Sequence, residues 1–442
     1  MTRMSIRTFR AAAIAVAGLI PFAASASAAV QPPGLEEALR RVATVAQAPA
    51  SKQAAEALWG VPLDAPVVLH DRVTGTSWRR NVATGDVESV VLRKDQPPAN
   101  TCIDIDGASN VLLILPLPAD NDGLATLLWH EQWHCVQAML GLSASEGDTA
   151  HLDGELGRMA LRLEMRALAQ ALSASDDRDA RPHVAAALQF RALRSAGSAS
   201  GTRVLGEEAR VERNEGLAEY TGRRVAAAAN RGNMVPALVK SLAAADASPS
   251  FVRSAAYVTG PAYGMLLDRW SPHWRTGLSP ASDLPALLAE QLGTPLSATG
   301  AEGVGRRYGM DEVRAQEHER ARIREQRSAG YRKRYLGGDS VRLPLSKPSA
   351  SFDPRALFPL DEVGTVYTPL TVRDEWGELT ADSGALMSKD WTLVTLSGGE
   401  VTGSASNWTG PGWTLVLNAG WRLEKESDGW RLTNVQGGDV HR

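Results

Sequence analysis

The chain has 442 residues, and its 47 Lys and Arg against 50 Asp and Glu give a formal net charge of −3 at pH 7. A chain this close to neutral, without a basic tract, lacks the charge distribution of nucleic-acid-binding proteins, so we expect no nucleic-acid partner. Its length is sufficient for two or three domains, each with a sizeable hydrophobic core.

The first 28 residues have the pattern of a secretory signal peptide. Arg3, Arg7 and Arg10 precede an apolar run from Ala11 to Ala24, and small residues follow as far as Ala28. Cleavage near Ala28 predicts a mature protein that is periplasmic or secreted. No later apolar run approaches the eighteen or so residues that a membrane span requires, so we expect no transmembrane segment in the mature chain.

Residues 30–123 predict an N-terminal α/β part that contains a small sheet. Apolar residues recur at helical spacing from Leu35 to Val45, and Pro49 is predicted to end that helix. Short β-branched or apolar runs follow. They predict mostly antiparallel strands within Val67–Leu69, Thr74–Val82, Val87–Leu92 and Val111–Leu115.

The clearest chemical signature lies in a helix predicted between Leu124 and Leu140, a stretch without Pro or Gly. It contains the pattern His-Glu-x-x-His at His130, Glu131 and His134. Positions four apart share one face of a helix, so both imidazoles can bind one zinc ion. Glu131 would then act as general base towards a water held by the metal. The pattern predicts the metal site of a hydrolase.

Cys102 and Cys135 are the two cysteines of the chain. In an oxidising compartment we predict a disulfide that ties the segment before the active helix to that helix, next to His134. Two buried free thiols are the alternative. A Cys135 thiolate on the metal is disfavoured because this residue points about 100° away from His134 around the helix.

Residues 124–335 predict a mainly helical domain, and residues 340–442 predict a C-terminal all-β domain. Helical segments are predicted at Leu152–Ala167, Ala186–Leu193, Arg203–Arg224, Ala237–Ala245, Pro261–Trp270 and Asp311–Arg334. The last is dense in charge, which indicates a solvated helix with His318 on its surface. Beyond it, apolar residues alternate with polar ones, as at Trp413–Leu417, which predicts a β meander or small barrel. The fold class predicted is therefore α+β.

A catalytic zinc site needs a third protein ligand. A metzincin-type histidine is excluded, because Gln137 and Leu140 stand where that class has Gly and His. A glutamate on a nearby helix is the remaining type of ligand. The candidates are Glu155, Glu164, Glu215 and Glu219.

The segment Asn214–Tyr220, with sequence Asn-Glu-Gly-Leu-Ala-Glu-Tyr, resembles the gluzincin metallopeptidases, the clan of thermolysin and aminopeptidase N. In the aminopeptidase branch the first Glu of a similar motif is the third zinc ligand, so the resemblance implies Glu215. Glu219, one turn later, could accept a hydrogen bond from a ligand imidazole. The 80 residues between His134 and Glu215 exceed the usual gap of the family, so Glu164 remains an alternative ligand.

A second segment, Tyr257–Gly260, resembles the Tyr-x-x-Gly segment of the same family. The resemblance implies that Tyr257 donates a hydrogen bond to the developing oxyanion, with Tyr263 as reserve candidate. A tyrosine that only packs at a helix start is the alternative. The aminopeptidases anchor the substrate amine with a Glu in an upstream Gly-x-Met-Glu-Asn stretch, whereas Gly107–Asn110 here has no carboxylate. Endopeptidase rather than aminopeptidase action is expected.

The resemblance covers residues 124–270 and implies an exported Zn²⁺ metallopeptidase that acts on peptide or protein substrates. Two other functions remain open. One is a zinc-stabilised binding protein of the cell envelope, although a structural site has no use for Glu131. The other is a zinc hydrolase of non-peptide amides.

Overall fold

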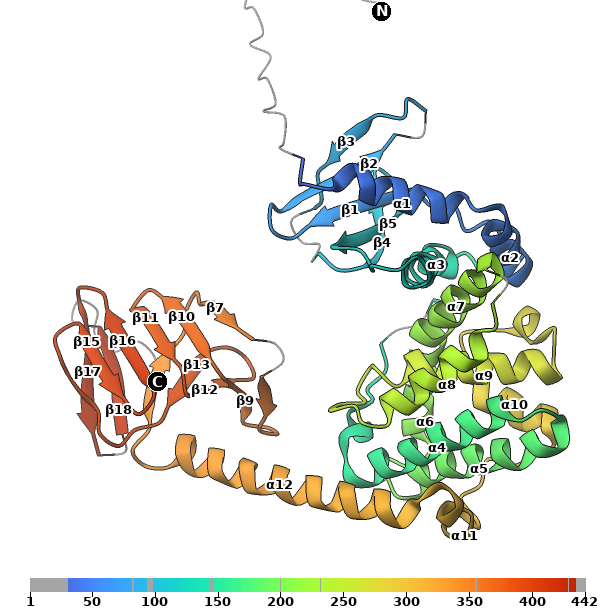
Figure 1. Cartoon of the computed structure of the whole chain (residues 1–442). Coiled ribbons are helices and arrows are strands. Elements are labelled where there is room, and N and C mark those ends of the chain that lie inside the picture. Colours follow the sequence, from blue (N-terminus) through green and yellow to red (C-terminus); the bar gives the residue numbers. More distant parts are fainter. Residues whose placement is uncertain are drawn as a thin grey trace, which may run out of the picture. The chain divides into compact units, whose positions relative to one another are not determined.

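The computed structural model describes residues 31–81, 83–93, 98–143, 146–198, 200–230, 232–353, 356–427 and 429–434, so the predicted signal peptide lies outside the described residues. The fold is α+β, as predicted, with a small mixed sheet, a helical region and an all-strand region with two sheets (Figure 1). None of the described helices combines the length and hydropathy needed to cross a membrane.

Residue contacts divide the chain into two compact units that are each built from several segments. The first comprises the described residues of Met1–Gly147, Glu208–Ser241 and Ala256–Leu292. The second comprises those of Asp148–Glu207, Leu242–Ala255 and Gly293–Arg442. The chain therefore leaves the first unit and returns to it twice.

The sheet of the first unit has the strand order β3-β2-β1-β5-β4. Its strands are β1 (Val67–Asp71), β2 (Thr76–Arg80), β3 (Val87–Val90), β4 (Thr101–Ile105) and β5 (Ala108–Leu115). Only the β1–β5 pair is parallel, so the expectation of a mostly antiparallel sheet is confirmed. The sequence prediction missed β4, which joins β5 through a two-residue turn at Asp106 and Gly107, both with positive φ.

Helices cover one face of this sheet. Helix α1 (Leu35–Gln47) and helix α3 (Asn121–Gln137) share a core with β1 and β5 that includes Leu39, Leu69, Val111 and Leu128. Helix α3 begins after Asp120, whose side chain accepts a hydrogen bond from the Gly123 amide. Pro49 not only follows the end of α1 but begins a second helix, α2 (Pro49–Trp59), because proline suits the first position of a helix.

The helical part of the first unit contains an interruption that the sequence prediction missed. The segment predicted as one helix from Arg203 to Arg224 consists of α6 (Arg203–Val211), a π-helical turn η2 (Glu212–Gly216) and α7 (Leu217–Asn230). Helix α9 (Ala256–Trp270) begins before Pro261, so Tyr257 lies in its first turn rather than ahead of it. The remaining elements are α8 (Met234–Ala245), which continues into the second unit, η3 (Trp274–Gly277) and α10 (Leu284–Leu292).

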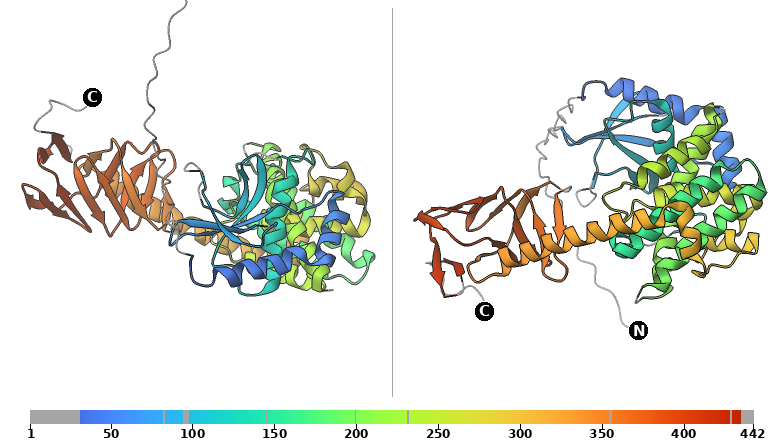
Figure 2. Two further views of the ribbon diagram at one scale, coloured as in Figure 1. Left: turned by 90° about the horizontal axis from the view of Figure 1, so that it is seen from above. Right: turned by 60° about the horizontal axis from the view of Figure 1, so that its bottom comes forward.

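The second unit contains a helical group whose contacts include buried ion pairs. Its elements are η1 (Ala150–Asp153), α4 (Glu155–Ser173), α5 (Asp177–Ala196), α11 (Ala301–Gly305), η4 (Arg306–Tyr308) and α12 (Met310–Leu336). Arg158 and Arg162 of α4 donate to the buried carboxylate of Glu317 in α12, at 2.7 and 2.8 Å. His318, on the next position of α12, is exposed as predicted. Figure 2 shows α12 along its length, leading into the strands that follow.

The C-terminal strands form two sheets around a common core. The sheets have the orders β14-β15-β16-β11-β10-β7 and β17-β18-β6-β13-β12-β9-β8. The strands are β6 (Val341–Pro344), β7 (Ser349–Phe352), β8 (Leu357–Pro359), β9 (Gly364–Tyr367), β10 (Leu370–Asp374), β11 (Gly377–Ala381), β12 (Ala385–Ser388), β13 (Leu393–Leu396), β14 (Thr402–Ser404), β15 (Asn407–Gly410), β16 (Trp413–Leu417), β17 (Trp421–Glu426) and β18 (Gly429–Asn434). The sequence predicted a β meander or small barrel, and the pairings of β16 with β11 and of β18 with β6 join strands that are not neighbours in the chain.

Candidate metal centre

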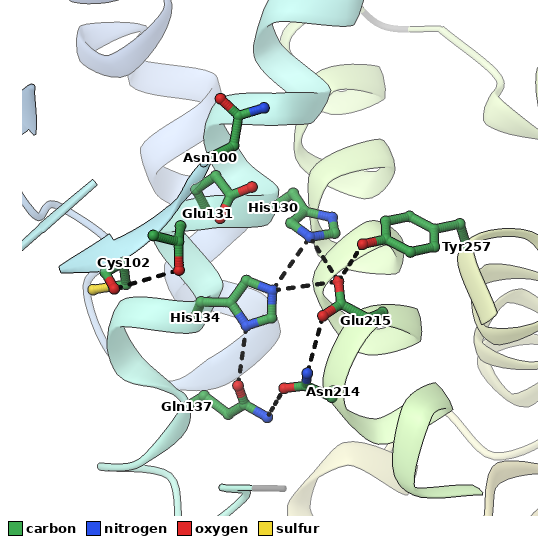
Figure 3. Close-up of a pocket in the computed structure, with 10 residues that line it drawn as sticks. Asn100, Cys102, His130, Glu131, His134, Gln137, Asn214, Glu215 and Tyr257 are labelled. Carbon is green, nitrogen blue, oxygen red and sulfur yellow. Dashed lines mark hydrogen bonds and ion pairs between the residues drawn. The ribbon is translucent and has the colours of Figure 1, made fainter. Parts of the chain in front are cut away.

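Three side chains of the first unit converge at the C-terminal half of α3 (Figure 3). The Nε2 atoms of His130 and His134 are 3.2 Å apart, and Oε2 of Glu215 lies 3.4 and 3.7 Å from them. One potential ligand atom from each residue lies within 4.8 Å of the other two, so the group could hold a metal ion. The structure thus brings together the two motif histidines and the third ligand that the resemblance implied.

The local fold explains this convergence. His130 and His134 are four residues apart in α3 and therefore project from one face of that helix. Glu215 comes from the π-helical turn between α6 and α7, and such single turns often occur at functional sites because they displace one residue from the regular helical register. Helices α3 and α7 pack closely: a side chain on Gly222 would meet the carbonyl of Thr126.

The outer nitrogens of both histidines are engaged, which determines how the inner ones are protonated. Nδ1 of His130 lies 3.2 Å from the carboxylate of Glu219, to which it donates. Nδ1 of His134 lies 3.1 Å from Oε1 of Gln137, an oxygen that can only accept. When the rings of His130 and His134 are neutral, the Nε2 atom of each therefore carries a lone pair that points towards the Nε2 of the other ring and towards Glu215. Three electron-rich atoms this close require a cation or a proton between them.

A chain of amide hydrogen bonds connects the second histidine to the third ligand. Nε2 of Gln137 donates to Oδ1 of Asn214 at 3.1 Å, and Nδ2 of Asn214 donates to Oε1 of Glu215 at 2.9 Å. Gln137 also donates to the carbonyl of Leu142 at 3.0 Å, which orients its amide. Sequence analysis missed both amides as parts of the site. The spacing His-x-x-Gln, one turn along a helix, was the signal for Gln137.

The site is electrostatically coupled. Burial lowers the pKa of His130, but hydrogen bonds to Glu215 and Glu219 outweigh it and raise this pKa to about 9 in the absence of metal. Burial raises the pKa of Glu215, yet hydrogen bonds from His130, His134 and Tyr257 lower it well below its usual range. The carboxylate of Glu215 stays ionised, and a bound cation would replace the proton held between it and the imidazole rings.

Glu131 lies beside the candidate metal ligands and is buried. It lines a cavity of about 350 Å³ together with the three candidate ligands, Tyr257 and five further residues, namely Asn100, Thr101, Cys102, Gln137 and Asn214. Burial raises the pKa of Glu131, while His130 and His134 oppose that shift. A carboxylate with a raised pKa at a cavity wall is suited to accept and return a proton near neutral pH.

Tyr257 lies on the α9 side of the same cavity. Its hydroxyl donates to Oε2 of Glu215 at 2.5 Å, and its ring stacks on His130 with 5.6 Å between centroids and 7° between planes. Burial, followed by the hydrogen bond to Glu215, raises the pKa of Tyr257, so its hydroxyl keeps its proton. Tyr263, the reserve candidate, is fully buried and is not among the residues that line the cavity.

The other glutamates named as possible ligands are engaged elsewhere. Glu164 is buried in the second unit, where Arg194 and Arg191 lie 2.5 and 3.5 Å from its carboxylate. The carboxylate of Glu155 lies 3.2 Å from His318. Glu219 supports His130 from behind, as the sequence suggested. Of the four candidates, Glu215 is the one that belongs to the histidine group.

Cys102 and Cys135 form the predicted disulfide, with their Cα atoms 5.2 Å apart. The bond ties β4 to α3 one residue beyond His134, and it removes Cys135 from consideration as a ligand. Strand β4 is at the edge of its sheet. In a hairpin closed by a two-residue turn the residues flanking the turn, Ile105 and Ala108, form a hydrogen-bonded pair, so the backbone groups of Cys102 and Asp104 face away from β5.

No model of a protein family matches the chain, and comparisons with curated proteins and with solved structures found no match either. The resemblance to gluzincins therefore stays a prediction that stands on the motifs at 130–134, 214–220 and 257–260.

Proposed function

We propose that the protein is an exported zinc metallopeptidase of gluzincin type that cleaves within peptide chains. The observation that carries this proposal is the meeting of His130, His134 and Glu215 next to the buried carboxylate of Glu131. Three ligands from two elements, with an additional acid left free beside them, are typical of catalytic rather than structural zinc sites.

The residues fit a zinc ion. In a tetrahedral site with bonds of about 2.0–2.1 Å, neighbouring ligand atoms are about 3.3 Å apart. The three separations here are 3.2, 3.4 and 3.7 Å. Two imidazoles and a carboxylate form a donor set that zinc prefers. When bound, zinc would supply a Lewis acid that activates water near neutral pH and polarises a carbonyl.

The surrounding residues then have distinct tasks. Glu131 accepts a proton from the attacking water and returns it to the departing amine. Tyr257 presents a neutral hydroxyl as hydrogen-bond donor to the developing oxyanion. Glu219, Gln137 and Asn214 hold the ligands in orientation, because each bonds a ligand atom that faces away from the metal position.

The residues around the cavity favour an extended, internal segment of a peptide as substrate. Outward-facing backbone groups of Cys102 and Asp104 on edge strand β4 can pair with a peptide as an additional strand, and Cys102 also lines the cavity. Among the described lining residues the carboxylates are Glu131 and Glu215, which already have tasks, and there is no Lys or Arg. A free amino or carboxyl terminus thus finds no charged anchor there.

Metal analysis combined with a cleavage profile tests the proposal. Purified protein should contain one zinc per chain and cleave internal bonds in a library of proteome-derived peptides. Glu131→Gln should keep zinc and lose cleavage by several orders of magnitude, because the water then lacks its base. Zinc retention without cleavage by the parent protein would favour a zinc-stabilised binding protein. Cleavage of simple amides but not of peptides would favour the non-peptide hydrolase.

A further inference from the structure

Helix α9 and the π-helical turn η2 touch backbone to backbone beside the metal centre. A Cβ atom added to Gly260 would lie 2.4 Å from the Cα of Gly216, and one added to Gly216 would lie 2.9 Å from the Cα of Gly260. Ordinary contacts of a Cβ atom begin near 3.4 Å. Neither glycine has a positive φ, so close approach, rather than an unusual backbone conformation, requires glycine at both positions.

Both glycines adjoin residues of the proposed catalytic centre. Gly216 directly follows Glu215 in η2, and Gly260 lies one turn after Tyr257 on α9. The separation of the two backbones therefore determines how far Tyr257 reaches towards Glu215. At the present separation its hydroxyl is 2.5 Å from the carboxylate. An α9 helix displaced by 1 Å or more would lose that hydrogen bond.

Contacts with other helices hold α7 in place, and α7 directly continues η2. A Cβ atom on Gly222 of α7 would lie 2.3 Å from the Thr126 carbonyl oxygen of α3, so these helices already touch. Glu219 of α7 bonds His130, and Nε1 of Trp59 donates to the Thr221 hydroxyl at 2.9 Å. An added methyl group at position 260 would therefore displace α9, and Tyr257 with it, while the ligand group remains assembled.

We propose that the contact between Gly216 and Gly260 positions Tyr257 at the metal centre. Neither glycine is among the residues that line the cavity, so they act through the distance between α9 and η2. The inference rests on the proposed function for the role of Tyr257 as oxyanion donor, but the geometric part stands without it. Displacements near 1 Å in a catalytic constellation reduce turnover by about a hundredfold.

The test compares Gly260→Ala with Gly264→Ala, the same change one turn farther along α9. A Cβ atom on Gly264 would meet the ring of Tyr220 at 2.6 Å, so the control also crowds the interface with α7 but away from the metal centre. The chain has seven tyrosines, and incorporated 3-fluorotyrosine gives each a ¹⁹F resonance. Tyr257→Phe identifies the signal of residue 257. We expect Gly260→Ala to shift it and Gly264→Ala to leave it in place.

Kinetic and metal-binding measurements complete the test. Gly260→Ala should bind zinc within about threefold of the parent affinity and lose turnover by about a hundredfold, the same loss that we expect for Tyr257→Phe. The double variant should be no slower than either single one, whereas Gly264→Ala should stay within about twofold of the parent. Gly216→Ala, with its milder clash, should show a smaller loss of the same kind, and it replaces Gly260→Ala if that variant fails to fold.

An unshifted Tyr257 resonance in the alanine variant, a loss of zinc, or a double variant with multiplied losses would each overturn the proposal. Failure of the proposed function looks different: the parent protein would then hydrolyse no peptide, while the ¹⁹F and zinc measurements would still show whether the glycine contact positions Tyr257.

Discussion

Of the candidate metal ligands, His130 and His134 were predicted by local spacing alone, because four residues make about one helical turn wherever the helix lies. Glu215 is different. Its approach depends on how α7 packs against α3, which periodicity does not encode, and only the resemblance at 214–220 singled it out. The roles of Gln137 and Asn214 were not predicted, because the function of a side-chain amide depends on its hydrogen-bond partner, which the sequence does not show.

At this scale the ligand assignment makes a direct prediction. His130→Ala, His134→Ala or Glu215→Ala should abolish tight zinc binding, whereas Glu164→Ala should retain it. Glu164→Ala should instead lower the free energy of unfolding by about 3–5 kcal/mol, because it removes a buried carboxylate that lies 2.5 and 3.5 Å from Arg194 and Arg191. Metal content after dialysis and chemical denaturation distinguish the two effects. An empty site in Glu164→Ala would contradict the assignment.

Zinc affinity should depend on pH in a direction set by His130. Its folded-state pKa of about 9 exceeds the 6.5 of an unperturbed imidazole, so without metal its proton stabilises the fold below pH 6.5 and that contribution is lost as pH rises through 9. Zinc requires the neutral ring and must displace that proton. Affinity measured in zinc buffers should therefore rise about tenfold per unit between pH 6.5 and 9. A zinc affinity that does not change over this pH range would contradict the presence of a proton on His130 in the metal-free protein.

The hydrogen bonds from Gln137 to Asn214 and from Asn214 to Glu215 predict that loss of Asn214 weakens zinc binding less than loss of a candidate ligand. Asn214→Ala removes the hydrogen bond that fixes Oε1 of Glu215 and deprives Gln137 of an acceptor. Losing such a supporting bond commonly weakens metal affinity by 10–100-fold. Competition with a chelator of known affinity measures this loss. Thr101→Ala, a change on the same cavity wall without a bond to any ligand, serves as control and should bind zinc like the parent protein.

At the scale of elements, prediction succeeded where a short sequence pattern determines a single helix or strand. It failed where the structure depends on how two elements are joined or paired. The runs that became β1, β2, β3 and β5 were visible, but β4 was missed, although the Asp106-Gly107 turn that creates its hairpin is a strong local signal. The π-helical turn was hidden because its pattern of residues, with Gly216 at the end, does not distinguish a π-helical turn from a continuous α-helix. The order of strands in the two C-terminal sheets depends on pairings between residues far apart in sequence, for which alternation carries no information.

The disulfide joins two such elements, and its removal has a predictable cost. It closes a loop of 33 residues, for which the chain-entropy estimate is about 4 kcal/mol of stability. The double variant Cys102→Ser and Cys135→Ser should therefore unfold at lower denaturant concentration by about that free energy. Zinc affinity should fall less than in ligand variants, since neither sulfur is a ligand. An unchanged unfolding midpoint would show that the bond does not constrain the unfolded chain.

At the scale of the whole molecule, metal should stabilise one part of the chain and not the other. All three candidate ligands belong to the first unit. A ligand that binds only the folded state adds RT ln(1 + [L]/Kd), or about 4 kcal/mol at a thousandfold excess over Kd. Calorimetry with and without chelator should shift the transition of the first unit and leave that of the second in place. A common shift of a single transition would show that the units unfold together.

The division of the first unit into three segments also has a consequence in time. A polypeptide is made from its N-terminus, so the two histidines emerge while Glu215 and Tyr257 have yet to be synthesised. Between them the chain must complete Asp148–Glu207, which folds into the other unit. The nascent chain thus passes through a long interval in which His130 and His134 are present but Glu215 and Tyr257 are not. The peptidase activity proposed above would therefore be withheld until Glu215 and Tyr257 have been synthesised and have joined the two histidines.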